Sequence, residues 1–246
     1  MNEENQTARR LDGWWARLMG ATLALITLAV QPSNRLAGQV GYDPARSPYR
    51  DAPTGSGPVF YAGYLGGGRG RVPVGISDGN TWGVRYNFEF GSASIDLGAA
   101  YGQTTRRIVD PFVAVKNNTS GLIDADVVLV DATLQMALTG PKTWRGLAPY
   151  IGASLGVAVG SDTRSDSSGY KFGTKFTFAP VIGAKYYVGR RVALSADFRA
   201  VFWRLGYPSQ FKVPDKVDNT PILSIDAADN NWTVHPWISL GLGWSF

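Results

Sequence analysis

The last fifteen residues constrain the fold of this chain more than any other stretch. They read W-T-V-H-P-W-I-S-L-G-L-G-W-S-F, and every second residue from Trp232 to Phe246 is apolar. The residues between them are small or polar, except for Trp237. A period of two predicts a β-strand with one apolar face and one mixed face. Globular strands typically have about 5–6 residues, whereas a tilted strand that crosses a bilayer needs roughly 9–11. This segment is therefore expected to span a membrane.

The ending resembles the closing strand of bacterial outer-membrane β-barrels, in which a terminal Phe after alternating apolar residues is the assembly signal. The residues that match this pattern are Ile238, Leu240, Leu242, Trp244 and Phe246. The resemblance implies that the barrel assembly machinery is a partner. The alternative is an edge strand of a soluble β-sandwich, but an edge this long, flat and apolar would promote aggregation.

Composition excludes several kinds of site. The chain has 246 residues, a net charge of +5, no cysteine and a single histidine, His235. Disulfides, thiolate metal sites and multi-histidine metal sites are therefore excluded, and we expect neither a metal nor a cofactor. The Lys and Arg residues are dispersed, which argues against nucleic acid and suits loops over an anionic lipid surface. No run of 18 apolar residues predicts a spanning helix.

The first 57 residues are predicted to lie outside the barrel. In residues 1–38, three arginines precede a 13-residue, mostly apolar stretch, Leu18 to Val30, which suits a signal peptide and is short for a transmembrane helix. The alternative is an uncleaved amphipathic anchor. Residues 39–57 carry Pro, Gly and charge without periodicity, and we interpret them as a periplasmic lead-in.

Seven further segments alternate like the last one. The clearest, 82–90, has Trp, Val, Tyr, Phe and Phe on one face and Gly, Arg, Asn and Glu on the other, whereas 59–65 has aromatics or glycine on both faces. The seven segments are 59–65, 82–90, 95–102, 128–138, 150–159, 175–187 and 192–202. With the last segment they predict an all-β fold, an eight-stranded antiparallel up-and-down transmembrane β-barrel over residues 58–246.

The connections favour the same fold. The predicted links alternate between long ones (66–80, 105–124, 161–173 and 204–231) and short ones (91–92, 139–146 and 188–191). Long external loops alternating with short periplasmic turns are typical of membrane barrels. Aromatic residues also lie near the ends of the apolar faces, as in interfacial girdles. These aromatics are Trp82, Phe90, Phe176, Tyr186, Trp232 and Trp244.

Residues 58–246 as a whole resemble the small eight-stranded outer-membrane barrels of the OmpA, OmpX and OmpW group, often labelled porin-like. The resemblance implies an outer-membrane protein in contact with outer-membrane lipids and lipopolysaccharide, and we expect a monomer. Pro180 and Pro236 depart from a regular ladder because each lacks a backbone donor. A bulge at either proline would reverse the predicted facing beyond it.

The inward faces are expected to hold a charge network. Its nine predicted members are Arg85, Glu89, Asp96, Asp131, Lys175, Lys185, Asp197, Arg199 and His235. An eight-stranded barrel is just wide enough inside for side chains, so these charges are expected to pair. Two interpretations remain open: an ion-pair network in place of an apolar core, or a narrow polar conduit whose pairs rearrange.

Function is predicted only broadly, as a non-enzymatic envelope protein with a structural, surface-interaction or narrow small-solute passage role. The alternative is an outer-membrane lipid-modifying enzyme, an acyltransferase or deacylase, with a triad of His235, Ser239 and Asp131 or Asp197. Position 237 is Trp, so the deacylase-type His-x-Ser pattern is missing, and His235 is predicted to face away from lipid. The G-G-G-R-G-R stretch at 66–71 precedes no helical pattern, which favours a rim loop near lipopolysaccharide phosphates over a phosphate-binding loop.

Overall fold

The computed structural model describes residues 47–68, 70–113, 117–160, 168–214 and 219–246. The predicted signal peptide and residues 39–46 of the predicted lead-in lie outside these ranges. Among the described residues, no helix combines the length and the hydropathy needed to cross a bilayer.

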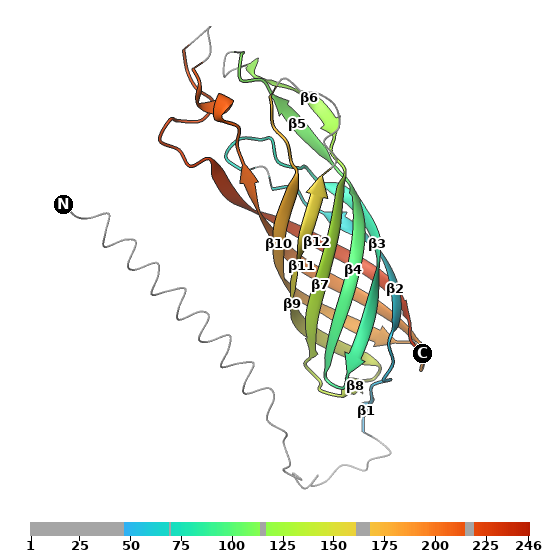
Figure 1. Cartoon of the computed structure of the whole chain (residues 1–246). Coiled ribbons are helices and arrows are strands. Elements are labelled where there is room, and N and C mark those ends of the chain that lie inside the picture. Colours follow the sequence, from blue (N-terminus) through green and yellow to red (C-terminus); the bar gives the residue numbers. More distant parts are fainter. Residues whose placement is uncertain (1–46, 69, 114–116, 161–167, 215–218) are drawn as a thin grey trace, which may run out of the picture. The chain divides into compact units, whose positions relative to one another are not determined.

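Eight long strands form a closed antiparallel barrel, which confirms the predicted fold (Figure 1). They are β2 (Gly57–Leu65), β3 (Gly79–Phe90), β4 (Ala93–Gln103), β7 (Val127–Ala137), β9 (Leu147–Gly160), β10 (Thr174–Tyr187), β11 (Val192–Gly206) and β12 (Asn230–Trp244). Each strand pairs with the next in the chain, and β12 pairs with β2 to close the sheet. β12 pairs with β11 along its whole length but with β2 only from Trp237 to Gly243.

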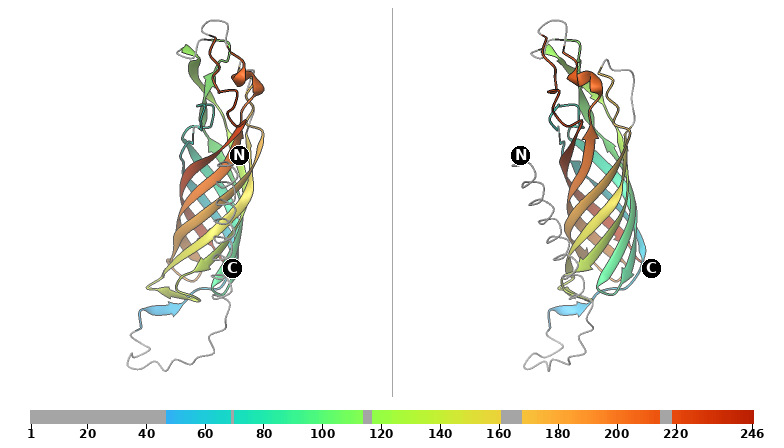
Figure 2. Two further views of the ribbon diagram at one scale, coloured as in Figure 1. Left: turned by 90° about the vertical axis from the view of Figure 1, so that its left-hand side faces the viewer. Right: turned by 60° about the vertical axis from the view of Figure 1, so that its left-hand side comes forward.

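The long and short connections lie at opposite ends of the barrel (Figure 2). The end with the long loops, here the loop end, includes a hairpin of β5 (Thr105–Val109) and β6 (Thr119–Asp124) and the 3-10 helix η3 (Ser209–Lys212). At the end with the short turns, β1 (Tyr49–Asp51) pairs with β8 (Lys142–Trp144). β1 falls in the predicted lead-in, and its three residues are too few to show an alternating pattern.

The predicted facing of the strands is confirmed by burial. On β12, Leu240 is 66% exposed and Ser239 is 2% exposed. Neither proline shifts the register: Pro180 stays opposite Ala153, and Pro236 stays opposite Ala200, in ladders that continue on both sides. Each proline therefore lacks its backbone donor without introducing a bulge, and the alternation continues past it.

The ambiguous segment 59–65 is resolved by its neighbours. Tyr61 and Leu65 are buried inside the barrel, and Phe60 and Tyr64 are exposed on the outside. Tyr61 contacts the ring of the inward residue Trp237, with centroids 6.0 Å apart. The inward aromatic is thus fixed by packing across the closing pair β12–β2, which the pattern of β2 alone could not indicate.

An apolar core fills the loop end of the barrel and continues into the loops. We call it the apolar plug, and its fully buried members include Leu65, Val74, Ile76, Val109, Trp203, Leu205 and Phe211. The edge of the Phe172 ring packs on Trp203, with centroids 5.7 Å apart. Strand interiors and loop segments therefore share one core, which the alternating pattern did not predict.

Candidate functional site

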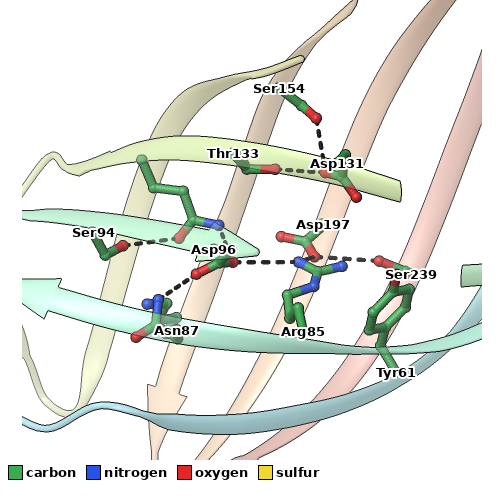
Figure 3. Close-up of polar contacts among 12 residues, drawn as sticks. Tyr61, Arg85, Asn87, Ser94, Asp96, Asp131, Thr133, Ser154, Asp197 and Ser239 are labelled. Carbon is green, nitrogen blue, oxygen red and sulfur yellow. Dashed lines mark hydrogen bonds and ion pairs between the residues drawn. The ribbon is translucent and has the colours of Figure 1, made fainter. Parts of the chain in front are cut away.

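Buried charges occupy the middle of the barrel, where Arg85 connects two neighbouring carboxylates (Figure 3). Its Nη1 lies 2.6 Å from Asp197 Oδ2 and 3.8 Å from Asp96 Oδ2. Ser239 Oγ donates to the same Asp197 oxygen at 3.2 Å. The Arg85 guanidinium also stacks over the ring of Tyr61, 4.2 Å from its centroid. These contacts join β2, β3, β4 and β11 through one guanidinium, and β12 is joined to them through Asp197.

Asp96 is held mainly by neutral donors. Asn87 Nδ2 donates to its Oδ1, and Gln135 Nε2 donates to its Oδ2 at 2.7 Å. Ser94 Oγ in turn donates to Gln135 Oε1 at 3.2 Å. Arg85 lies closer to Asp197 than to Asp96, so neutral donors must compensate most of the Asp96 charge. An uncompensated buried charge is energetically expensive.

Arg199 forms the second buried ion pair. Its Nη1 lies 2.7 Å from Asp131 Oδ2, and the hydroxyls of Thr133 and Ser154 donate to the same oxygen, each at 2.8 Å. The guanidinium also faces the Trp237 ring, 5.2 Å from its centroid. We call Arg85, Asp96, Asp131, Asp197 and Arg199 the central charge network; it ties strands together across the lumen.

A more open region lies toward the short-turn end. Lys185 Nζ is 3.2 Å from Glu89 Oε1, and the Tyr187 hydroxyl donates to the same oxygen at 3.1 Å. Two cavities of about 40 and 30 Å³ share these three residues and Tyr150 in their walls. A site for one water needs roughly 10–15 Å³, so each cavity has room for a few waters. We call this region the periplasmic vestibule, because the short turns of an outer-membrane barrel are expected on the periplasmic side.

His235 lies between the central charge network and the apolar plug. It is fully buried and stacks on Trp203, with centroids 3.8 Å apart. Nε2 lies 2.9 Å from Thr233 Oγ1, and the Gly68 N–H donates to Nδ1 at 3.0 Å. The carbonyl of Gly66 is also 3.1 Å from Nδ1. These contacts dock the first long loop onto the barrel.

The geometry gives no support to the triad. Ser239 donates to Asp197, while Asp131 is held by Arg199, Thr133 and Ser154. His235 instead contacts Thr233, Gly66 and Gly68. Within the described ranges, no three His, Cys, Asp or Glu side chains are grouped so that they could hold a metal ion.

The structure separates the nine predicted network residues into groups. Five form the central charge network, Glu89 and Lys185 lie in the periplasmic vestibule, and His235 lies against the apolar plug. Lys175 was predicted to belong to the same network, but it lies at the loop end of β10 with its ammonium 5.7 Å from the centroid of the Phe172 ring. The prediction took its phase into account but not its depth in the barrel.

The neutral partners were missed, although the sequence carried a signal for them. The missed residues are Tyr61, Asn87, Ser94, Thr133, Gln135, Ser154 and Trp237. Asn87 and Ser94 lie two positions from Arg85 and Asp96, on the same faces of their strands. Applying the inward phase to every side chain of these strands, charged or neutral, would have found all of them except Tyr61, whose strand has aromatics or glycine on both faces.

The outer surface of the barrel is formed by exposed apolar side chains. These side chains include the predicted assembly-signal residues Ile238, Leu240, Leu242, Trp244 and Phe246, all well exposed. Their role in assembly remains a prediction. An apolar band of this size is unfavourable in water and favourable in lipid. A closed sheet has no free edge, so all of its backbone N–H and C=O groups can be hydrogen-bonded within the bilayer. An outer-membrane location follows from this exterior.

No protein-family model matches the chain, and no curated protein matches its sequence. Solved structures are similar in fold. Neisserial surface protein A (NspA) has 16% identity and a TM-score of 0.46, over 81% of this chain and 98% of that one. The outer membrane protein OprG from Pseudomonas aeruginosa has 15% identity and a TM-score of 0.47, over 80% and 98%. Ail of Yersinia pestis has 16% identity and a TM-score of 0.33, over 78% and 99%. By its own closed sheet and apolar exterior, the chain is an eight-stranded outer-membrane β-barrel protein.

Proposed function

We propose that this protein is a non-enzymatic envelope protein, a closed barrel that holds a folded loop assembly at the cell surface for contact with other surfaces. One observation carries the proposal: the apolar plug and the central charge network together fill the barrel from the loop end to its middle. A filled interior favours an anchoring role over passage of solutes.

The fit of the plug argues against a permanent passage. Trp203, Leu205 and Phe211 are fully buried at the loop end, and His235 is fully buried beneath them. A hydrated conduit would leave such side chains in contact with water. The cavities of the periplasmic vestibule extend as far as Arg85 and Asp96 of the central charge network, but these four side chains do not line them.

The loops hold one another in place through specific contacts. The Arg71 N–H donates to the Tyr207 hydroxyl at 2.8 Å, joining the first long loop to the last. The Ser77 N–H donates to the Thr105 carbonyl at 2.6 Å, joining the first loop to the second. Lys212 and Asp229 form an ion pair at 2.6 Å within the last loop. A loop assembly fixed in this way presents a defined surface, as a binding role requires.

Exposed side chains at the loop end suit surface contact. Phe112 lies in the loop between β5 and β6, Leu122 lies on β6, and each is 62% exposed. Arg71 and Lys171 are exposed cations of the loop end, and we propose that they contact lipopolysaccharide phosphates. Exposed apolar side chains at the same end of the barrel as exposed cations suit a contact surface.

Conductance in planar bilayers tests the proposal. The refolded wild-type chain is expected to show no steady open pore, because the plug blocks the loop end. A steady, ion-selective wild-type current would instead establish the narrow-passage role. The enzyme alternative is tested by the acyl chains of lipopolysaccharide and phospholipid in cells that express the wild type or His235→Gln. Both are expected to match cells without the protein.

A further inference from the structure

The short-turn end of the barrel is rich in basic side chains. Its exposed cations are Arg50, Lys142, Arg145, Arg190 and Arg191. None of these five forms an ion pair with a described residue. Of the carboxylate side chains described at this end, Glu89 is bound to Lys185, and Asp51 lies opposite Lys142 in the β1–β8 ladder. The remaining positive charge is therefore unmatched by described residues.

Three of these arginines follow one stretch of the rim, which we call the basic rim: Arg145, Arg190 and Arg191. Arg145 and Gly146 form the turn between β8 and β9, and the Tyr187 N–H donates to the Gly146 carbonyl at 2.8 Å. The chain then enters the turn of residues 188–191, closed by the Val188 N–H on the Val192 carbonyl at 3.0 Å. The two turns are thus neighbours, and their arginines share one side of the barrel.

Outward apolar side chains are interleaved with the basic rim. Trp144 is 45% exposed, Tyr186 48% and Val188 63%, and the Arg145 guanidinium lies 5.6 Å from the centroid of the Trp144 ring. These side chains continue the apolar exterior to its lower edge. Aromatic and basic residues at such an edge lie at the depth of lipid headgroups.

The backbone of Arg145 supports the same assignment. Its φ of 51° is followed by Gly146 at 88°, the two left-handed positions of a tight hairpin turn. Asn or Gly normally occupies the first of these positions, because a larger side chain strains the backbone there. An arginine at this point is understandable if its side chain binds something outside the protein.

We propose that the basic rim binds the headgroups of anionic phospholipids in the periplasmic leaflet of the outer membrane. Guanidinium groups bind phosphate oxygens in pairs of parallel hydrogen bonds, and two arginines are adjacent in the 188–191 turn. The placement of the rim at the edge of the apolar exterior favours lipid over a soluble polymer. This inference concerns the end opposite the loop assembly and does not depend on the proposed function.

Spin-labelled lipids provide the test, with the full chain refolded in phosphatidylcholine vesicles. The wild type is expected to prefer labelled phosphatidylglycerol over labelled phosphatidylcholine about threefold. One basic residue near an anionic headgroup raises the affinity roughly fivefold, and the measured preference is an average over all lipids that contact the barrel. The triple variant Arg145→Gln, Arg190→Gln, Arg191→Gln should bring the ratio close to one. The same three positions changed to Lys should keep most of the preference.

A matched control removes two exposed cations of the short-turn end that lie outside the basic rim, Arg50→Gln and Lys142→Gln, and is compared with the double variant Arg190→Gln, Arg191→Gln. It should keep the wild-type ratio, and heat-modifiable migration on gels should show that every variant is folded. Addition of millimolar glycerol 3-phosphate should leave the ratio unchanged, because a free phosphate lacks the depth in the membrane that the rim requires.

Three results would overturn the proposal. The first is an unchanged ratio in the basic-rim variant, and the second is an equal loss in the control. The third is a basic-rim variant that stops sedimenting with purified peptidoglycan while its lipid preference is intact, which would make an acidic cell-wall polymer the partner. If the triple Gln variant fails to fold, the double variant Arg190→Gln, Arg191→Gln decides, with an expected loss of most of the preference.

Discussion

At the loop end the barrel is filled by Trp203, Leu205 and Phe211, whereas its middle is filled by Arg85, Arg199 and their carboxylate partners. The apolar plug includes residues of the long loops, such as Ile76 and Phe211, while every member of the central charge network lies on a strand. The apolar plug and the central charge network are therefore built from different parts of the chain. The plug couples loop order to barrel stability, and the network couples one strand to another.

The largest effect is expected in the apolar plug. Trp203→Ala should lower the free energy of unfolding by about 3–5 kcal/mol, because it leaves a large cavity among fully buried side chains. Urea unfolding in lipid vesicles measures the loss. Trp203→Phe is the control and should lose much less. A loss under about 1 kcal/mol for the alanine variant would mean that the plug is loosely packed.

The central charge network should respond nearly as strongly. Arg199→Met leaves Asp131 without its guanidinium and should cost about 3 kcal/mol, the lower end for a buried pair, since Thr133 and Ser154 still donate to the carboxylate. Adding Asp131→Asn should recover part of the loss. If the single variant is nearly neutral and the protein then conducts ions, the middle of the barrel is a hydrated pore.

His235 lies between the apolar plug and the central charge network, so its substitution should lower the free energy of unfolding by an intermediate amount. His235→Gln removes the stack on Trp203 and should cost about 1–2 kcal/mol. Hydrogen exchange of the Gly68 amide is the sharper readout, because that N–H donates to Nδ1. The exchange should become faster at Gly68 and stay unchanged in the 188–191 turn. Unchanged protection at Gly68 would show that the first loop is held by other contacts.

The smallest effect is expected in the periplasmic vestibule. The side chains of Lys185 and Glu89 are 14% and 13% exposed and lie beside the cavities. Lys185→Met should therefore cost about 1 kcal/mol or less, and the difference from wild type should shrink in high salt. A loss of several kcal/mol that salt does not change would place this pair in a dry environment, like that of Arg199.

The sequence predicted the strands because a period of two is a local signal. Every outward residue of β3 and β12, including the positions beyond Pro236, faces as expected. Facing needs only the position of a residue along its own strand. For the same reason the inward phase of Arg85, Asp131 and Arg199 was available without a structure.

The sequence did not indicate which inward side chains contact each other, or how far along the barrel each one lies. Arg85 and Asp197 are 112 positions apart, and Gly68 and His235 are 167 apart, so closure of the barrel decides which side chains meet. The plug was missed because its loop residues, such as Ile76 and Phe211, show no alternation. Lys175 was misplaced because phase does not indicate how far along the barrel a residue lies.

The short pairing between β12 and β2 also bears on how the chain folds. Seven of the eight strand pairs join neighbours in the chain, but the pair that closes the barrel joins its first strand to its last. Pairing over that separation has the greatest loss of chain entropy, which favours formation of the successive hairpins first. The contact from Trp237 to Gly243 would then form last and, being limited to that stretch, would be the first to separate when the sheet opens.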